Sequence, residues 1–174
     1  LFHRLAATLF FIAASALWTS AIAQLGTKTT GQGTSVVTTP YVRAELLAHA
    51  PQGVAPGQPL WLGLSITHQP EWHTYWKNPG DSGLPTELQW NLPAGLNAGA
   101  IAWPIPKLMR IGSLANYGYE GELLLPVPVT VTQDFAPPAS GMVAVRLNAT
   151  WLVCRVECIP ENGQFTLQLP TQGA

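Results

Sequence analysis

Residues 142–153 read Met-Val-Ala-Val-Arg-Leu-Asn-Ala-Thr-Trp-Leu-Val, and apolar and polar side chains alternate along most of this segment. Such alternation predicts a β-strand that turns one face toward a core. Several further segments show the same pattern or a β-rich composition: residues 41–48, 60–67, 88–92, 122–132 and 165–169. Short strands separated by turn residues predict an all-β protein with two packed sheets, a β-sandwich.

Prolines and glycines mark the limits of these strands. Residues 70–86 hold three prolines and two glycines around an aromatic cluster, and we expect a long structured loop there. Residues 100–103 are predicted to form a short strand. The two prolines within residues 122–132 suit an edge strand or a strand with bulges. In total we expect seven or eight short strands, no helix and no second domain.

The composition excludes several classes of protein. Charged residues make up 10% of the 174-residue chain, against about 25% in a typical soluble domain. A net charge of −1 with eight basic residues argues against nucleic-acid binding. The apolar content is too high for a disordered chain, and 16 Pro with 16 Gly disfavour a helical bundle. Two cysteines cannot build a disulfide-dense scaffold or a four-thiolate zinc site.

The beginning of the chain has the features of a secretory signal over residues 1–23. An uncharged apolar run at residues 5–17 is followed by Ala-Ile-Ala at residues 21–23, which fits the small-x-small cleavage pattern. The run is shorter than the roughly 20 residues that a membrane-spanning helix needs, and a retained N-terminal anchor is the alternative. Residues 24–40 are predicted to form a flexible leader, followed by a domain over residues 41–170.

The two cysteines, Cys154 and Cys158, are separated by three residues. In one continuous strand their Cα atoms would lie roughly 13 Å apart, whereas a disulfide needs about 5.5 Å. A bond between them therefore requires the chain to turn back. A helix would also bring the cysteines closer, but the β-branched neighbours and the nearby Pro160 favour a tight turn at Arg155–Glu157. Three interpretations are open: reversible thiol exchange, a structural cross-link, or binding of a soft metal such as Cu(I) together with His68 or His73.

Three segments together resemble the N-terminal periplasmic domain of the DsbD family, and most closely its ScsB-like branch (suppressor of copper sensitivity). They are Trp72-His-Thr-Tyr-Trp-Lys-Asn-Pro-Gly-Asp-Ser-Gly-Leu-Pro85, Asn116-Tyr-Gly-Tyr-Glu120 and Cys154-Arg-Val-Glu-Cys-Ile-Pro-Glu161. The combination of the first segment with Cys-x-x-x-Cys-x-Pro-Glu is fairly specific, whereas neither is specific alone. The better-known members place more residues between their cysteines, so the ring here is smaller.

The resemblance implies an immunoglobulin-like fold and a role in the periplasm of a Gram-negative bacterium. Such a domain takes electrons from a membrane-embedded thiol domain, in the same or a separate chain. It passes them to oxidised periplasmic thioredoxin-fold proteins, such as disulfide isomerases or cytochrome c maturation thioredoxins. The implied exchange is that of a protein-disulfide reductase, and it needs no organic or metal cofactor.

The resemblance also assigns candidate site residues. Cys158 would form the mixed disulfide with the partner and Cys154 would resolve it. An aromatic cap would shield the disulfide, for which Tyr117 and Tyr119 are the candidates, with Gly118 allowing the loop to swing. The candidates for the cleft or the docking surface are Trp72, His73, Tyr75, Trp76 and Glu120, with Asp81 as a further acidic neighbour.

Each aromatic candidate also has a purely structural interpretation, because aromatic residues in a loop can simply cover the end of a sandwich. Two alternative functions use the same cysteines. One is a periplasmic copper-binding or copper-tolerance module that holds the metal with the two thiols and a histidine. The other is an interaction domain in which the disulfide is only structural.

Overall fold

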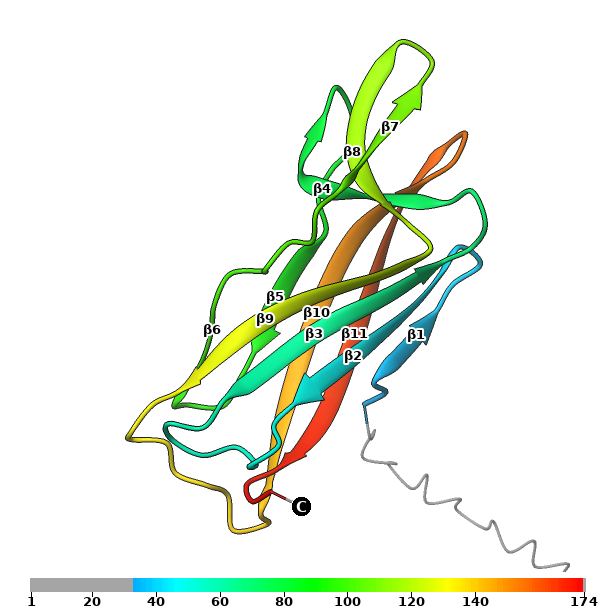
Figure 1. The fold of residues 1–174 in the computed structure, drawn as a ribbon. Coiled ribbons are helices and arrows are strands. Elements are labelled where there is room, and N and C mark those ends of the chain that lie inside the picture. The colour runs from blue at the N-terminus through cyan, green and yellow to red at the C-terminus, as the bar shows by residue number, and fades with distance from the viewer. Residues whose placement is uncertain (1–32, 174) are drawn as a thin grey trace, which may run out of the picture. The chain divides into compact units, whose positions relative to one another are not determined.

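The computed structural model describes residues 33–173, which form two β-sheets packed face to face (Figure 1). Sheet A contains, in the order of hydrogen-bonded neighbours, β1 (Val36–Thr38), β2 (Val42–His49), β3 (Leu60–His68), β9 (Glu122–Val131) and β6 (Leu96–Ala98). Sheet B contains β11 (Cys158–Pro170), β10 (Met142–Cys154), β4 (His73–Gly80), β8 (Leu114–Glu120) and β7 (Lys107–Ile111), and β5 (Glu87–Asn91) also pairs with β10.

The predicted fold class, an immunoglobulin-like two-sheet β-sandwich, is confirmed. All strand pairs within the sheets are antiparallel. Alternate residues of the central strands fill the space between the sheets, which explains the period-two pattern of the sequence. The side chains that are fully buried include Leu46, Leu62, Leu64, Ile66, Leu125, Val143 and Leu147. Among residues 33–173 there is no helix, and hence none long and apolar enough to cross a bilayer.

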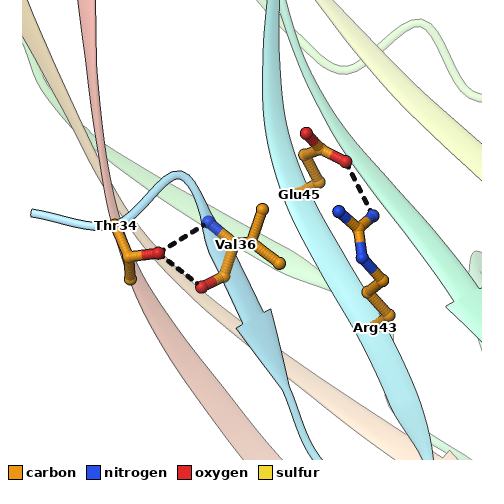
Figure 2. Close-up of polar contacts among 4 residues, drawn as sticks. All are labelled: Thr34, Val36, Arg43 and Glu45. Atoms are coloured by element: carbon orange, nitrogen blue, oxygen red, sulfur yellow. Dashed lines mark hydrogen bonds and ion pairs between the residues drawn. The ribbon is translucent and has the colours of Figure 1, made fainter.

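The predicted signal at residues 1–23 lies outside the described residues, as does the first part of the predicted leader. The rest of that leader is not flexible, because residues 36–38 form β1 and pair with β2. Figure 2 shows how this strand begins: the Thr34 hydroxyl accepts from the Val36 N–H at 3.1 Å and donates to the Val36 carbonyl at 2.7 Å. The same figure shows the exposed ion pair of Arg43 and Glu45, 2.7 Å apart, on the neighbouring β2.

Main-chain hydrogen bonds explain why the end of the leader is ordered. The Thr34 carbonyl accepts from the Thr166 N–H of β11 at 2.9 Å, and the Ser35 carbonyl accepts from the Leu46 N–H of β2 at 2.8 Å. Two consecutive residues are therefore bonded to different sheets. The Gly- and Thr-rich composition gave no sign of this, because these bonds use the main chain only.

Two other expectations for local structure are wrong. The predicted loop at residues 70–86 contains β4, because residues 73–75 pair with β8 before a bulge interrupts the register near Gly80. The predicted strand at residues 100–103 is irregular, and the short strand β6 precedes it. The described residues form eleven strands in place of seven or eight, and the hairpin of β7 and β8 accounts for two of the additional ones.

The strand β9 is not an edge strand, because β3 and β6 pair along its two sides. Its prolines are tolerated because of their orientation. The carbonyls of Pro126 and Pro128 accept from Ala102 and Gly99 on the β6 side, at 2.8 Å in both cases. Since the N and the carbonyl of one residue point to the same side of an antiparallel strand, the absent N–H groups face β6 and are not needed for pairing with β3.

Two leucines of sheet A allow a test of the position of the core. Leu64 is fully buried in β3, whereas Leu124 of the adjacent β9 is 46% exposed. Leu64→Ala is expected to lower the free energy of unfolding by about 2–5 kcal/mol, because it leaves a cavity. Leu124→Ala is expected to change it by about 0.5 kcal/mol or less. Denaturant unfolding of the oxidised protein measures both values, and equal losses would contradict this assignment of faces.

Candidate functional site

The two cysteines form a disulfide at the tip of the hairpin made by β10 and β11. Cys154 and Cys158 are register partners, and their Cα atoms lie 4.1 Å apart. The turn between them closes with a hydrogen bond of 3.1 Å from the Arg155 N–H to the Glu157 carbonyl, so the predicted tight turn is confirmed. Cys154 is only 2% exposed, whereas Cys158 is exposed to solvent.

Strand alternation puts this disulfide on the outer face of sheet B. Trp151 and Val153 of β10 point into the core, so Cys154 points outward. The register pairs Cys154 with His73 at the start of β4, which brings the outward side chains of the two strands together. Figure 1 shows the tip of this hairpin and the hairpin of β7 and β8 at the same end of the described unit.

Two of the predicted residues, His73 and Tyr75, lie at the disulfide. The Tyr75 hydroxyl is 3.8 Å from Cys158 Sγ and 3.3 Å from His73 Nε2. The two rings meet edge to face with their centroids 5.3 Å apart. If His73 Nε2 donates to the Tyr75 oxygen, the Tyr75 hydroxyl is free to donate to the sulfur, and this arrangement satisfies both contacts.

Burial sets the protonation of these two groups. Tyr75 is 1% exposed, and desolvation raises the pKa of its phenol, an effect that the nearby side chain of Ser82 opposes. Desolvation lowers the pKa of His73, and the charge of Glu120 opposes this. At neutral pH the Tyr75 phenol therefore keeps its proton, and the His73 imidazole is uncharged. The contact with Cys158 Sγ thus comes from a neutral hydroxyl that can act as a donor.

Glu120 lies beside this pair. It is the register partner of His73 on β8, so the two side chains share the outer face of sheet B. Its carboxylate is 3.8 Å from the Lys107 ammonium, and both side chains are largely exposed. The acidic neighbour predicted from the sequence is therefore next to the histidine.

Asp81 has a different place from Glu120. Its carboxylate accepts from the Ala115 N–H at 2.8 Å, and its own N–H donates to the Ala115 carbonyl at 3.1 Å. Asp81 therefore ties the segment after β4 to β8.

Trp72 lies at the base of the hairpin tip. Trp72 is 9% exposed, and its ring packs on Tyr41 with the centroids 4.2 Å apart. The guanidinium of Arg155, which lies between the two cysteines, sits 5.6 Å from the centroid of the Trp72 ring. The same guanidinium is 3.4 Å from the Glu71 carboxylate. The predicted residue Trp72 therefore contacts the turn that carries the disulfide.

Trp76 does not share the face of the disulfide. It follows Tyr75 directly in β4, so its side chain points to the opposite side of sheet B. There its ring meets the ring of Tyr117 edge to face, with the centroids 6.3 Å apart, and Lys77 lies 5.5 Å from the Trp76 centroid. The aromatic cluster predicted as one surface is therefore divided between the two faces of the strand.

The expected aromatic cap needs correction in the same way. Gly118 pairs with Tyr75, so the neighbouring Tyr117 points away from the face that holds the disulfide. Tyr119 is only 6% exposed, belongs to the core and donates to the Pro104 carbonyl at 2.8 Å. Gly118 is not a hinge, because it lies within β8, where a Cβ would overlap the Thr74 carbonyl oxygen.

Sequence reasoning missed two residues that touch the site, Ser82 and Gly83. The Gly83 backbone lies directly against the Tyr75 ring. A glycine among prolines is a sign of a turn, but it does not reveal which side chain the backbone will approach. Within residues 33–173, no three or more His, Cys, Asp or Glu side chains gather in a way that could hold a metal ion.

Comparisons with known proteins agree with the fold described above. The model of the family described as "Thiol:disulfide interchange protein DsbD, N-terminal" matches residues 43–170. Among solved structures, the N-terminal periplasmic domain of ScsB from Proteus mirabilis is similar, with a TM-score of 0.58 and 20% sequence identity. The match covers 77% of this chain and 50% of that chain, so the similarity spans about half of the ScsB structure. None of the curated protein sequences matches significantly.

A buried histidine next to the site predicts a dependence of stability on pH. His68 of β3 is 6% exposed; its Nδ1 donates to the Gly121 carbonyl at 2.7 Å, and its Nε2 accepts from the Thr74 hydroxyl at 2.9 Å. Desolvation is the largest influence and lowers the pKa of His68; His73 adds to this effect, while the Gly121 bond and the charge of Glu120 oppose it. The neutral form is therefore favoured in the folded state.

Because its pKa is lower in the folded than in the unfolded state, His68 stabilises the fold above its ordinary pKa, and this contribution is lost as the pH falls. The free energy of unfolding is expected to drop below about pH 6.5, by at most about 1.4 kcal/mol per pH unit for this one proton. His68→Gln should reduce the slope, and His73 should supply part of the remainder. Denaturant unfolding at a series of pH values measures how the free energy of unfolding depends on pH, and His49→Gln, at an exposed position, is the control. If His68→Gln leaves this pH dependence unchanged, His68 is not its source.

Proposed function

Because the chain belongs to the family of N-terminal domains of DsbD thiol:disulfide interchange proteins, we propose that it exchanges disulfides with partner proteins through Cys154 and Cys158. The observation that carries this proposal is the position of Cys158. Cys158 is exposed at a hairpin tip and its sulfur lies 3.8 Å from the Tyr75 hydroxyl, whereas Cys154 is buried. A purely structural cross-link has no need of one exposed cysteine beside a hydroxyl donor.

The exchange balances as two consecutive displacements. In the reduced protein, the Cys158 thiolate attacks one sulfur of a partner disulfide; a bond between Cys158 and the partner forms, the partner disulfide breaks, and the partner's other sulfur leaves as a thiolate. The Cys154 thiolate then attacks Cys158, which re-forms the intramolecular disulfide and releases the partner's second thiolate. The partner gains two electrons, and the two protons from the cysteine thiols end on its sulfurs.

The exposure of the two cysteines supports this order. An intermolecular attack needs a sulfur that another protein can approach, and of the two cysteines only Cys158 is exposed. Cys154 is covered, so it attacks only the neighbouring sulfur, with which its residue is paired across the hairpin. The resolving step is therefore intramolecular, and the short turn keeps the two sulfurs close.

The protein acts in the periplasm, where the ScsB domain that it resembles is found. A membrane-embedded protein dithiol reduces the disulfide of Cys154 and Cys158 by the same exchange, and the electrons pass on to oxidised thioredoxin-fold proteins. The reaction uses sulfur chemistry alone and needs no further cofactor. This relay involves partners beyond the described unit, in the same or a separate chain.

A single cysteine substitution should trap the intermediate. Cys154→Ala removes the resolving thiol, so incubation of the reduced variant with an oxidised thioredoxin-fold protein is expected to accumulate a mixed disulfide through Cys158. Cys158→Ala is expected to accumulate none, because Cys154 is buried. Non-reducing electrophoresis and mass spectrometry of the linked peptides measure both products, with the double variant as the control.

Three outcomes would contradict the proposal or its order. Trapping only in Cys158→Ala would reverse the roles of the two cysteines. If the unaltered protein exchanges with no oxidised thioredoxin-fold partner, and its reduction only lowers the melting temperature, the disulfide is structural. Tight binding of one equivalent of Cu(I) by the reduced protein, lost in His73→Ala, together with an absence of exchange, would favour the copper-binding alternative.

A further inference from the structure

The segment that follows β4 lies across the ring of Tyr75. Gly83 has a φ of +97°, and a Cβ built on it would overlap the Cδ1 and Cε1 atoms of the Tyr75 ring. Pro85 forms an isolated β-bridge with Tyr75 itself. Only a glycine allows the backbone both this conformation and this close approach. The segment of residues 81–85 therefore covers the tyrosine that contacts Cys158.

Asn116 of β8 holds this segment in place through hydrogen bonds to Ser82. Its Oδ1 accepts from the Ser82 N–H at 2.9 Å and from the Ser82 hydroxyl at 3.2 Å. Asp81 makes the two bonds to Ala115 described above, so adjacent residues of the segment are bonded to adjacent residues of one strand. Ser82 is the direct neighbour of Gly83, so the hydrogen bonds of Ser82 also restrain Gly83, the residue that contacts the Tyr75 ring.

The burial of Asn116 calls for an explanation. Its side chain is 0% exposed, and its Nδ2 has no hydrogen-bond partner among the described residues. A buried amide with an unpaired donor costs free energy, which an apolar side chain of similar size would avoid. An apolar side chain in place of Asn116 would lose the two hydrogen bonds that Oδ1 accepts from Ser82. The function of Asn116 thus lies in holding the covering segment.

We propose that Asn116 is a positioning residue, which holds the Tyr75 hydroxyl at Cys158 Sγ by binding Ser82 and so keeping Gly83 against the Tyr75 ring. The inference rests on the proposed function, because it concerns the reactivity of Cys158 after reduction. In the reduced protein the Tyr75 hydroxyl donates to the Cys158 thiolate and stabilises the charged form. If the cover is released, the ring loses its fixed position, and the thiolate loses this donor.

The test measures how the alkylation rate of Cys158 depends on pH. The reduced protein is treated with iodoacetamide between pH 5 and 10, and mass spectrometry follows the modification of Cys158. Tyr75→Phe is expected to move the midpoint of this profile about one unit toward alkaline pH, because a hydrogen bond to a charged group is lost. Asn116→Ala is expected to move it in the same direction, because the acceptor of the two Ser82 hydrogen bonds is lost.

A double variant separates positioning from a general loss of stability. If Asn116 acts through Tyr75, Asn116→Ala causes no further shift when Tyr75→Phe is already present, so the two effects are not additive. Additive shifts, or a midpoint in Asn116→Ala equal to that of the unaltered protein, would overturn the inference. The same holds if Tyr75→Phe alone leaves the midpoint unchanged.

A pair of glycine variants provides the second measurement, in case Asn116→Ala does not fold. Gly83→Ala pushes the cover off the Tyr75 ring, so its alkylation midpoint is expected to move to alkaline pH. Gly112→Ala is the matched control, because Gly112 also has a positive φ, +62°, but a Cβ there meets no atom within 4 Å. Equal midpoints in these two variants would refute the inference.

The alkylation profile needs no partner protein, so it is independent of the exchange reaction. If the protein exchanges with thioredoxin-fold partners but Asn116→Ala does not shift the alkylation midpoint of Cys158, the proposed function holds and the positioning role of Asn116 is wrong. A protein that shows the shift but exchanges with no partner keeps the positioning of Tyr75 and loses the proposed function. The two conclusions can therefore fail separately.

Discussion

The antiparallel pairing of β10 with β11 is the constraint on which both the core and the candidate site depend. The register runs without interruption from Met142, opposite Pro170, to Cys154, opposite Cys158. Because side chains alternate across a strand, this register sends Val153 into the core and turns Cys154 to the outer face. A shift of the pairing register by one residue would turn Val153 outward and Cys154 into the core. The packing of the core therefore also determines where the disulfide lies.

The strand β4 brings His73 and Tyr75 to the disulfide, and the orientation of both depends on Thr74 between them, which points inward. Thr74 is fully buried and donates to His68 of sheet A, so it ties β4 to the opposite sheet. Its two neighbours, His73 and Tyr75, consequently point outward, toward the disulfide. The contact between a phenol and a sulfur at the surface thus depends on a buried hydrogen bond between the sheets.

The sequence was sufficient to predict the sandwich, because buried strands show period-two alternation. It also predicted the turn at the cysteines, because the β-branched neighbours and Pro160 disfavour a helix there. It did not reveal the hairpin of β7 and β8, where exposed apolar residues such as Leu108, Ile111 and Leu114 obscure the alternation. The sequence also did not show which aromatic residues lie on the same face of the sheet as the disulfide. The contact of Tyr75 with Cys158 spans 83 residues, and it depends on the pairing of β4 with β10, for which local sequence carries no signal.

The segment Cys158-Ile-Pro-Glu161 joins the cysteine proposed to react with partners to a residue that attaches the hairpin to the fold. Alternation turns Cys158 outward and Glu161 inward. The Glu161 carboxylate accepts from Trp151 Nε1 at 2.9 Å and from the hydroxyl of Thr39, before β2, at 3.1 Å. One side chain of the hairpin is thereby bonded both to its partner strand and to the connection between β1 and β2, three residues from the exposed cysteine. Because these two bonds hold the strand beside Cys158, the proposed exchange at Cys158 would leave the register of β11 unchanged.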